Sequence, residues 1–310
     1  MSAGATTTVL GATAFVPGRQ VSQLTVIDTR TRQQQVLLET TAHIEAPNWS
    51  PDGDWLLYNS EGRLFKLRAD GTGAPAEVPT ELPAWANNDH VISPDGATIY
   101  ASVNDGHIYA IPWAGGAARR VSNLHPSGTL WLYYLHGISP DGLTLLYVGL
   151  TGAADSPRYG LYSLPSAGGP DVLLWDGGVP ADGPEFSPDG QWIYFNAEAP
   201  ERDAGHAQLY RMRADGSGVE QLSHDERVNW FPHPSPDGSQ LASLSYPPGT
   251  LGHPANREVV LHCRPAAGGA ATELVSLLGG QGTVNVNSWA PDSRWLAYVA
   301  YPECAPQSGA

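Results

Sequence analysis

The chain has 310 residues, of which 41% are hydrophobic and 15% are charged, so its composition supports a buried core. Its formal net charge at pH 7 is −15, and Lys66 is its only lysine. Because nucleic acids and anionic membranes attract clustered Lys and Arg, this balance argues against both as partners. No run of about 18 apolar residues occurs, so no membrane-spanning helix is expected.

The N-terminal segment predicts a cytoplasmic location. Residues 1–15 contain neither a basic stretch nor a continuous apolar run, and so do not resemble a secretory signal. The two cysteines, Cys263 and Cys304, do not have the spacing of a metal site. We expect two free thiols, as in most cytoplasmic proteins, with a single disulfide bond between them as the alternative.

A repeated tetrapeptide, Ser-Pro-Asp-Gly, dominates the sequence. Full copies begin at Ser50, Ser93, Ser139, Ser187 and Ser235, and an altered copy, Ala-Pro-Asp-Ser, begins at Ala290. The copies are separated by 43 to 55 residues. A period of this length with several short strands in each unit is typical of a repeat array or a propeller. We therefore expect residues 1–310 to form a single repeat domain.

Residues 46–80 illustrate the strands expected in one repeat. Pro51 and Asp52 suit the central positions of a type I turn, and Gly53 suits the left-handed residue that follows. The tetrapeptide therefore joins a first strand to a second. A later Ala-Asp-Gly or Ala-Gly-Gly joins a third strand to a fourth. Four antiparallel strands per repeat predict a propeller blade.

The predicted fold is an all-β, six-bladed β-propeller with four antiparallel strands per blade. In chain order the blades span residues 43–80, 85–122, 130–176, 181–223, 228–276, and 285–303 together with 22–39.

The last blade is expected to combine both ends of the chain. Its final repeat supplies only two strands, and residues 24–27 and 35–38 supply the other two. Closing the ring in this way removes exposed sheet edges. Ser293 replaces the turn glycine of this blade, and a positive φ there would cost about 1 kcal/mol.

A large apolar residue precedes five of the six turns. We expect these side chains to fill the core between blades; they are Trp49, Ile92, Ile138, Phe186 and Trp289.

The segments that begin each first strand are unusually polar, and propeller geometry directs all six toward the axis. We place a candidate ligand site there, in a funnel on the face opposite the Ser-Pro-Asp-Gly turns. This top face also carries the loops that lengthen late in the chain, and long loops on a rigid scaffold often carry function. The candidate ligand-binding residues are Asn88, Asp89, His90, His136, Asp182, Glu185, His233, Gln281 and Asn285.

Three of these residues, His90, His136 and His233, could hold a divalent metal. Imidazoles beside carboxylates suit Mn, Fe or Zn, but the same groups could form an acid–base pair or simply line a solvated channel. His90 and His136 lie three residues before the turn serine, whereas Glu185 and His233 lie two before it. Strand alternation would point them to different sides unless β-bulges intervene. The remaining histidines, including His253, are expected to be surface or packing residues without functional partners.

The Trp-Ser-Pro-Asp-Gly unit followed by a short apolar strand resembles the repeat of TolB-like six-bladed propellers, and the similarity covers essentially the whole chain. Residues 87–90, 182–185, 230–238 and 279–283 resemble a stand-alone bacterial subgroup of these proteins. TolB itself is periplasmic, has an additional α/β domain and docks protein partners. The resemblance therefore implies the fold. It also suggests that the protein could dock a partner, but neither a secretory signal nor the additional domain of TolB is recognised in the sequence.

A second resemblance concerns residues 231–234, Phe-Pro-His-Pro. They are similar to a motif of oligogalacturonate lyases, propellers that hold Mn with three His and a Gln and cleave by β-elimination. The resemblance implies His233 as a metal ligand and Gln281 as a candidate for the glutamine. Phe231 stands where those enzymes have another histidine.

The leading hypothesis is a TolB-like propeller without a demonstrated activity that binds a small polar ligand or a protein partner through the top funnel; the sequence leaves open whether it is an enzyme. One alternative is a metal-dependent lyase or hydrolase acting on a sugar acid or an oligosaccharide. The other is a protein–protein interaction scaffold. Nucleophile-elbow, P-loop and dinucleotide-binding motifs are absent from the sequence, so it gives no support to a serine hydrolase or a nucleotide-binding protein.

Overall fold

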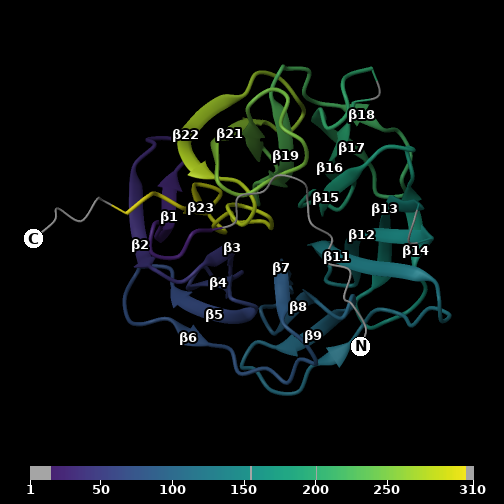
Figure 1. The fold of residues 1–310 in the computed structure, drawn as a ribbon, viewed down its shortest axis with the longest axis horizontal. Coiled ribbons are helices and arrows are strands. Elements are labelled where there is room, and N and C mark those ends of the chain that lie inside the picture. The colour runs from purple at the N-terminus through teal and green to yellow at the C-terminus, as the bar shows by residue number, and fades with distance from the viewer. Residues whose placement is uncertain (1–14, 154–155, 200, 305–310) are drawn as a thin grey trace, which may run out of the picture.

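The computed structural model describes residues 15–153, 156–199 and 201–304. They form six antiparallel sheets arranged radially around a central axis (Figure 1), which confirms the six-bladed propeller. No helix long and apolar enough to cross a membrane occurs in this part of the chain.

Five of the sheets have four strands each, with the first strand nearest the axis. The first blade contains β3 (Ile44–Trp49), β4 (Trp55–Ser60), β5 (Arg63–Arg68) and β6 (Ala76–Glu77). The second contains β7 (Ala86–Ile92), β8 (Thr98–Val103), β9 (Ile108–Pro112) and β10 (Arg119–Arg120). The third contains β11 (Leu130–Ile138), β12 (Thr144–Ala153), β13 (Ser156–Pro165) and β14 (Val172–Trp175). The fourth contains β15 (Ala181–Phe186), β16 (Trp192–Glu198), β17 (Ala207–Arg213) and β18 (Glu220–Gln221). The fifth contains β19 (Val228–Pro234), β20 (Gln240–Tyr246), β21 (Arg257–Pro265) and β22 (Thr272–Gly279).

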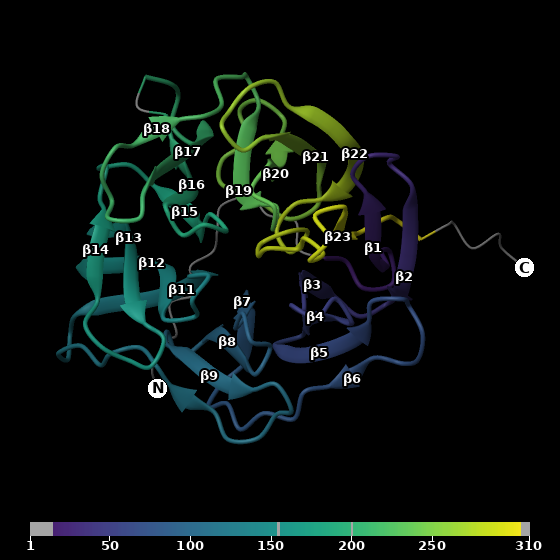
Figure 2. The ribbon, with the colours of Figure 1, turned by 180° about the vertical axis from the view of Figure 1, so that it is seen from behind.

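The sixth blade is closed by strands from both ends of the chain, as expected. β23 (Trp295–Ala300) pairs with β1 (Ser22–Asp28), which pairs with β2 (Gln34–Thr40). Figure 2 shows the purple strands β1 and β2 beside the yellow β23. The innermost position of this blade holds only an isolated bridge between Trp289 and Leu296, so its first strand is reduced to a single pairing.

The Ser-Pro-Asp-Gly sequence forms a hydrogen-bonded turn. The Ser50 hydroxyl donates to Asp52 Oδ1 over 2.6 Å and accepts from the Trp55 N–H at 2.9 Å. Asp52 Oδ1 also accepts from the Asp54 N–H, and Gly53 adopts a φ of 79°. The other four full copies repeat these bonds. The recurring serine and aspartate of the repeat therefore stabilise a turn.

Neighbouring turns contact one another around the ring. A Cβ added to Gly142 would lie 3.4 Å from Cδ of Pro94, which belongs to the turn of the preceding blade. In the altered copy, Ser293 has a φ of 58°, as the sequence suggested, and its hydroxyl accepts the N–H of Asp237 at 2.9 Å. The strained serine thus links the last turn to the one before it.

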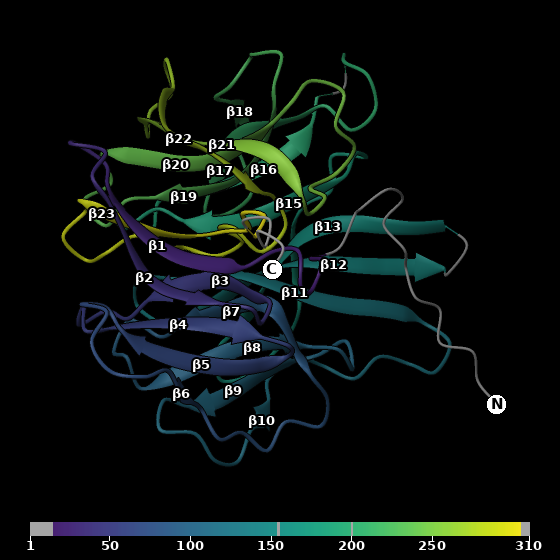
Figure 3. The ribbon, with the colours of Figure 1, turned by 60° about the vertical axis from the view of Figure 1, so that its left-hand side comes forward.

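The apolar cores lie between successive blades, and the five residues that precede the turns pack against them as predicted. Both cysteines are free: Cys263 is buried and Cys304 is exposed. In the third blade, β12 and β13 are 10 residues each, and together with β11 they project beyond the strands of the other blades (Figure 3). This projection brings Tyr159 to the top of the propeller, where it lines the funnel.

Candidate functional site

A β-bulge in each inner strand determines which side chains reach the axis. The pairing register of β3, β7, β11, β15 and β19 shifts shortly before the turn, in β15 between Asp182 and Glu185. Four residues before the turn serine, Ala46 and Phe231 have positive φ values of 54° and 55°, and Gly183 has 61°. A bulge changes the direction in which the following side chains point. Residues two positions before the serine and residues three positions before it can therefore both face the channel.

His136, which is buried, and Asp182, which is partly buried, form an ion pair between the third and fourth blades. His136 Nε2 lies 2.8 Å from Asp182 Oδ1, and its Nδ1 lies 3.3 Å from the Asn285 carbonyl oxygen. Because both partners are acceptors, the ring donates from both nitrogens. Burial disfavours the protonated form of His136 and lowers its pKa. The negative charges of Asp182 and Asp89 have the larger combined effect and raise the pKa of His136 to about 9. Burial raises the pKa of Asp182, yet His136 holds it well below its usual range.

His253 joins this pair from the loop between β20 and β21, which corrects the expectation that it has no functional partner. Its Nε2 lies 3.5 Å from Asp182 Oδ2, and its Nδ1 bonds Gln281 Oε1. Gln281 Oε1 also accepts from Asn285 Nδ2 at 3.2 Å. The ring packs against Trp230, with centroids 4.5 Å apart. The length of its loop was the only sequence feature that pointed to this position.

Two further carboxyl groups lie beside the pair: Glu45 is partly buried and Asp89 is buried. Asn88 Nδ2 donates to Glu45 Oε1 over 3.3 Å, and Asn87 Nδ2 donates to Asp89 Oδ2 over 2.8 Å. Burial raises the pKa of Glu45 to about 7, the Asn88 bond lowers it and the Asp89 charge raises it further. Burial raises the pKa of Asp89 to about 6, although His136 opposes this shift. The hydrogen bonds to these two carboxyl groups do not offset the cost of burying their charged forms. A hydrogen-bond donor or a cation would stabilise the charged forms.

Glu45, Asp182 and His253 line a cavity of about 710 Å³ on the top face, which we call the top funnel. Trp230 in its wall is only 7% exposed, and its indole N–H has no hydrogen-bond partner among residues 15–153, 156–199 and 201–304. An unpaired buried donor is costly unless something else accepts its bond. The side chains that line the funnel include Phe15, His43, Glu45, Tyr159, Asp182, Trp230, His253 and Gln281.

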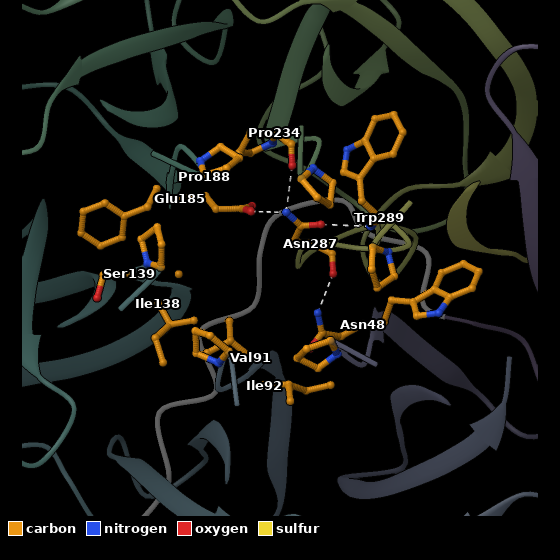
Figure 4. Close-up of a pocket in the computed structure, with 18 of the residues that line it drawn as sticks. Asn48, Val91, Ile92, Ile138, Ser139, Glu185, Pro188, Pro234, Asn287 and Trp289 are labelled. Carbon is orange, nitrogen blue, oxygen red and sulfur yellow. Dashed lines mark hydrogen bonds between the residues drawn. The ribbon is translucent and has the colours of Figure 1, made fainter. Parts of the chain in front are cut away.

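His233 and Glu185 form a second pair nearer the turn face. His233 Nδ1 lies 2.7 Å from Glu185 Oε2, and its Nε2 lies 2.7 Å from the Val284 carbonyl oxygen. Glu185 Oε1 accepts from Asn287 Nδ2, and both residues line a different cavity on the turn face (Figure 4). The two pairs connect the inner strands of the third, fourth and fifth blades with the segment before β23.

His90 does not join the other candidate residues. It is fully buried, and neither ring nitrogen has a hydrogen-bond partner in the described part of the chain. Burial lowers its pKa to about 4, which the adjacent backbone of Leu57 and Ala46 in the first blade partly offsets. No three His, Cys, Asp or Glu side chains among the described residues are arranged to hold a metal ion. The structure therefore separates the three histidines that the sequence grouped as metal ligands.

The nine candidate residues thus fall into three places. His90 lies apart from both pairs, and Glu185 and His233 form the pair toward the turn face. The other six lie in or beside the top funnel, although His136, which reaches it through Asp182, itself lines the cavity on the turn face. They are Asn88, Asp89, His136, Asp182, Gln281 and Asn285. The sequence did not single out Glu45, Trp230 or His253, which complete the funnel.

Comparisons with known proteins identify relatives along nearly the whole chain. The uncharacterized protein Atu1656 of Agrobacterium fabrum is 39% identical over 289 residues, covering 92% of this chain and 94% of that protein. The structure of a TolB-like protein from Agrobacterium tumefaciens matches with a TM-score of 0.83 and 39% identity, covering 92% of this chain and 99% of that one. No protein-family model matches the chain.

More distant structures share only the fold. TolB from Acinetobacter baumannii has a TM-score of 0.57 and 16% identity, over 84% of this chain and 65% of that one. An oligogalacturonate lyase in complex with manganese has a TM-score of 0.56 and 16% identity, over 84% of this chain and 74% of that one.

Proposed function

Since the chain belongs to the TolB-like six-bladed β-propellers, whose radial scaffold leaves an axial funnel, we propose that this protein binds a small polar ligand in its top funnel. The observation that carries the proposal is a cavity of about 710 Å³ whose wall includes Trp230, a residue with a buried indole N–H that has no hydrogen-bond partner in the described part of the chain. Ligand sites typically combine a cavity of this size with apolar walls and a few convergent polar groups. The funnel has both features.

The charges in the funnel favour a neutral or cationic ligand. Asp182 is compensated by His136, but Glu45 and Asp89 have raised pKa values because burial penalises their charged forms. An anionic ligand would add to that penalty, whereas hydroxyl or ammonium donors would relieve it. The rings of Tyr159 and Trp230 offer apolar faces against which a ligand could pack. We therefore favour a neutral or amino-substituted polyol over a sugar acid.

Calorimetric titration with three probes of similar size tests this proposal: inositol as the neutral polyol, glucosamine as the cation and galacturonate as the anion. We expect the first two to bind and to raise the melting temperature, since a ligand that binds only the folded state stabilises it. Tighter binding of galacturonate would contradict the proposed charge preference.

The variant Trp230→Phe provides the matched test of the site. It keeps an aromatic ring in the wall but removes the unpaired N–H, so the free protein should remain folded. Losing one ligand hydrogen bond worth about 1 kcal/mol should weaken binding by roughly five- to tenfold. An unchanged affinity in this variant would show that the ligand does not use the top funnel as proposed.

A further inference from the structure

A second cavity lies on the opposite side of the propeller, within the ring of Ser-Pro-Asp-Gly turns. It has a volume of about 390 Å³, and we call it the turn-face cavity (Figure 4). Its walls are mainly apolar, because the residues that precede the turns both pack into the blades and face the channel. These wall residues are Trp49, Ile92, Ile138, Phe186 and Trp289.

Asn48 and Glu185 present acceptors to this cavity. His136 also lines it, but both of its ring nitrogens already donate, to Asp182 and to the Asn285 carbonyl oxygen. Asn48 is 7% exposed, and its Nδ2 donates to the Asn287 carbonyl oxygen over 2.5 Å. That bond fixes the amide orientation and leaves Asn48 Oδ1 without a partner in the described part of the chain. The Glu185 carboxylate also lines the cavity, where it accepts from His233 and Asn287. The Asn48 oxygen therefore lacks a donor that a bound molecule could supply.

The turns around the cavity, which we call its rim, add negative charge: their aspartates do not line the cavity, but each directly follows a proline that does. Each of the six turns carries an exposed aspartate, and in the five full copies the serine hydroxyl and a backbone N–H lower its pKa. These side chains are therefore ionised at neutral pH. Arg68, Arg30 and Arg294 act on three of the six, Asp52, Asp237 and Asp292 respectively. A ring of carboxylates around a concave mouth concentrates cations there.

We propose that the turn-face cavity binds an organic cation that carries an ammonium group on an apolar body. The ammonium group donates to Asn48 Oδ1 and to the Glu185 carboxylate, and the apolar body packs against the ring of wall residues. The carboxylates of the rim attract the cation before it enters. This site is distinct from the top funnel, so it does not depend on the function proposed for the funnel.

Three probes that share a phenyl body test the proposal by calorimetric titration: phenethylammonium, phenethyl alcohol and 3-phenylpropionate. Phenethylammonium should bind at least about tenfold more tightly than the alcohol, and the carboxylate should show no binding. Raising the salt concentration should weaken phenethylammonium binding, because salt screens the exposed rim charges. Equal affinity for the ammonium and the alcohol, or tighter binding of the carboxylate, would overturn the proposal.

Two sets of variants locate the binding site. Asn48→Leu removes the unpaired acceptor and should weaken phenethylammonium binding by about tenfold. The double variant Asp95→Asn/Asp141→Asn keeps the Oδ1 acceptors of both turns but removes two rim charges, and it should reduce both the affinity and its salt dependence. It also tests the proposal if Asn48→Leu does not fold.

The control is Asp70→Asn/Asp215→Asn, which removes the same charge from exposed turns that do not line the cavity. We expect its affinity for phenethylammonium to equal that of the unmodified protein. If the rim and control variants weaken binding equally, overall charge rather than the rim explains the attraction, and the proposal is wrong. The same conclusion follows if a folded Asn48→Leu variant retains full affinity.

Discussion

Replacing Asp182 with Asn should expose the contribution of the His136–Asp182 pair through its pH dependence. Asn keeps the shape of the side chain and one acceptor oxygen. It removes the negative charge that stabilises the His136 imidazolium in its buried position. In the unmodified protein the pKa of His136 rises from 6.5 to about 9. A rise of this size corresponds to about 3 kcal/mol of folding free energy. Breaking a buried pair by removing one partner typically costs 3–5 kcal/mol, which agrees in scale.

The direction of the pH dependence follows because the pKa of His136 is higher in the folded protein than in the unfolded chain. The stabilisation is fully present below pH 6.5 and is lost as the pH rises toward 9. Urea unfolding at a series of pH values should therefore show the unmodified protein losing about 3 kcal/mol from this pair across that window. Asp182→Asn should be less stable at pH 6.5, and the difference should shrink as the pH approaches 9.

An exposed ion pair gives the matched control. Arg202 and Glu226 lie 3.1 Å apart with exposed side chains, so Glu226→Gln should change stability by less than about 1 kcal/mol at every pH. Parallel stability curves for the unmodified protein and Asp182→Asn between pH 6.5 and 9 would refute the assignment of a charged His136.

Three other predictions concern the turns, the thiols and metal binding. Ser139→Ala removes the hydroxyl that accepts the Thr144 N–H and should lower the free energy of urea unfolding by about 1–2 kcal/mol; no change would mean that the hydroxyl adds nothing to the turn. Burial raises the pKa of Cys263 to about 12, so a thiol reagent should modify Cys304 rapidly and Cys263 only on unfolding; two fast thiols would contradict the buried position. Elemental analysis should find no stoichiometric Mn, Fe or Zn, because the three candidate histidines do not converge; one equivalent of metal that disappears in His136→Ala would reverse that conclusion.

The turn chemistry allowed the blades to be counted without tertiary information. The bonds between Ser50, Asp52 and the next backbone N–H groups span only five residues, so each turn is specified locally. The same reasoning anticipated the positive φ of Ser293 and the strands from both ends that close the ring. It did not anticipate that the first strand of the last blade is reduced to one bridge.

The side chains that meet at the axis required the tertiary structure. A bulge changes the alternation of a strand by one residue, and no local pattern marked where each bulge falls. His136 therefore meets Asp182, while His90, at the same distance from its turn, lies elsewhere. The sequence alone determined the blades, because their turns are local. Only the folded ring decided which polar residues share a cavity, because those residues come from different blades and long loops.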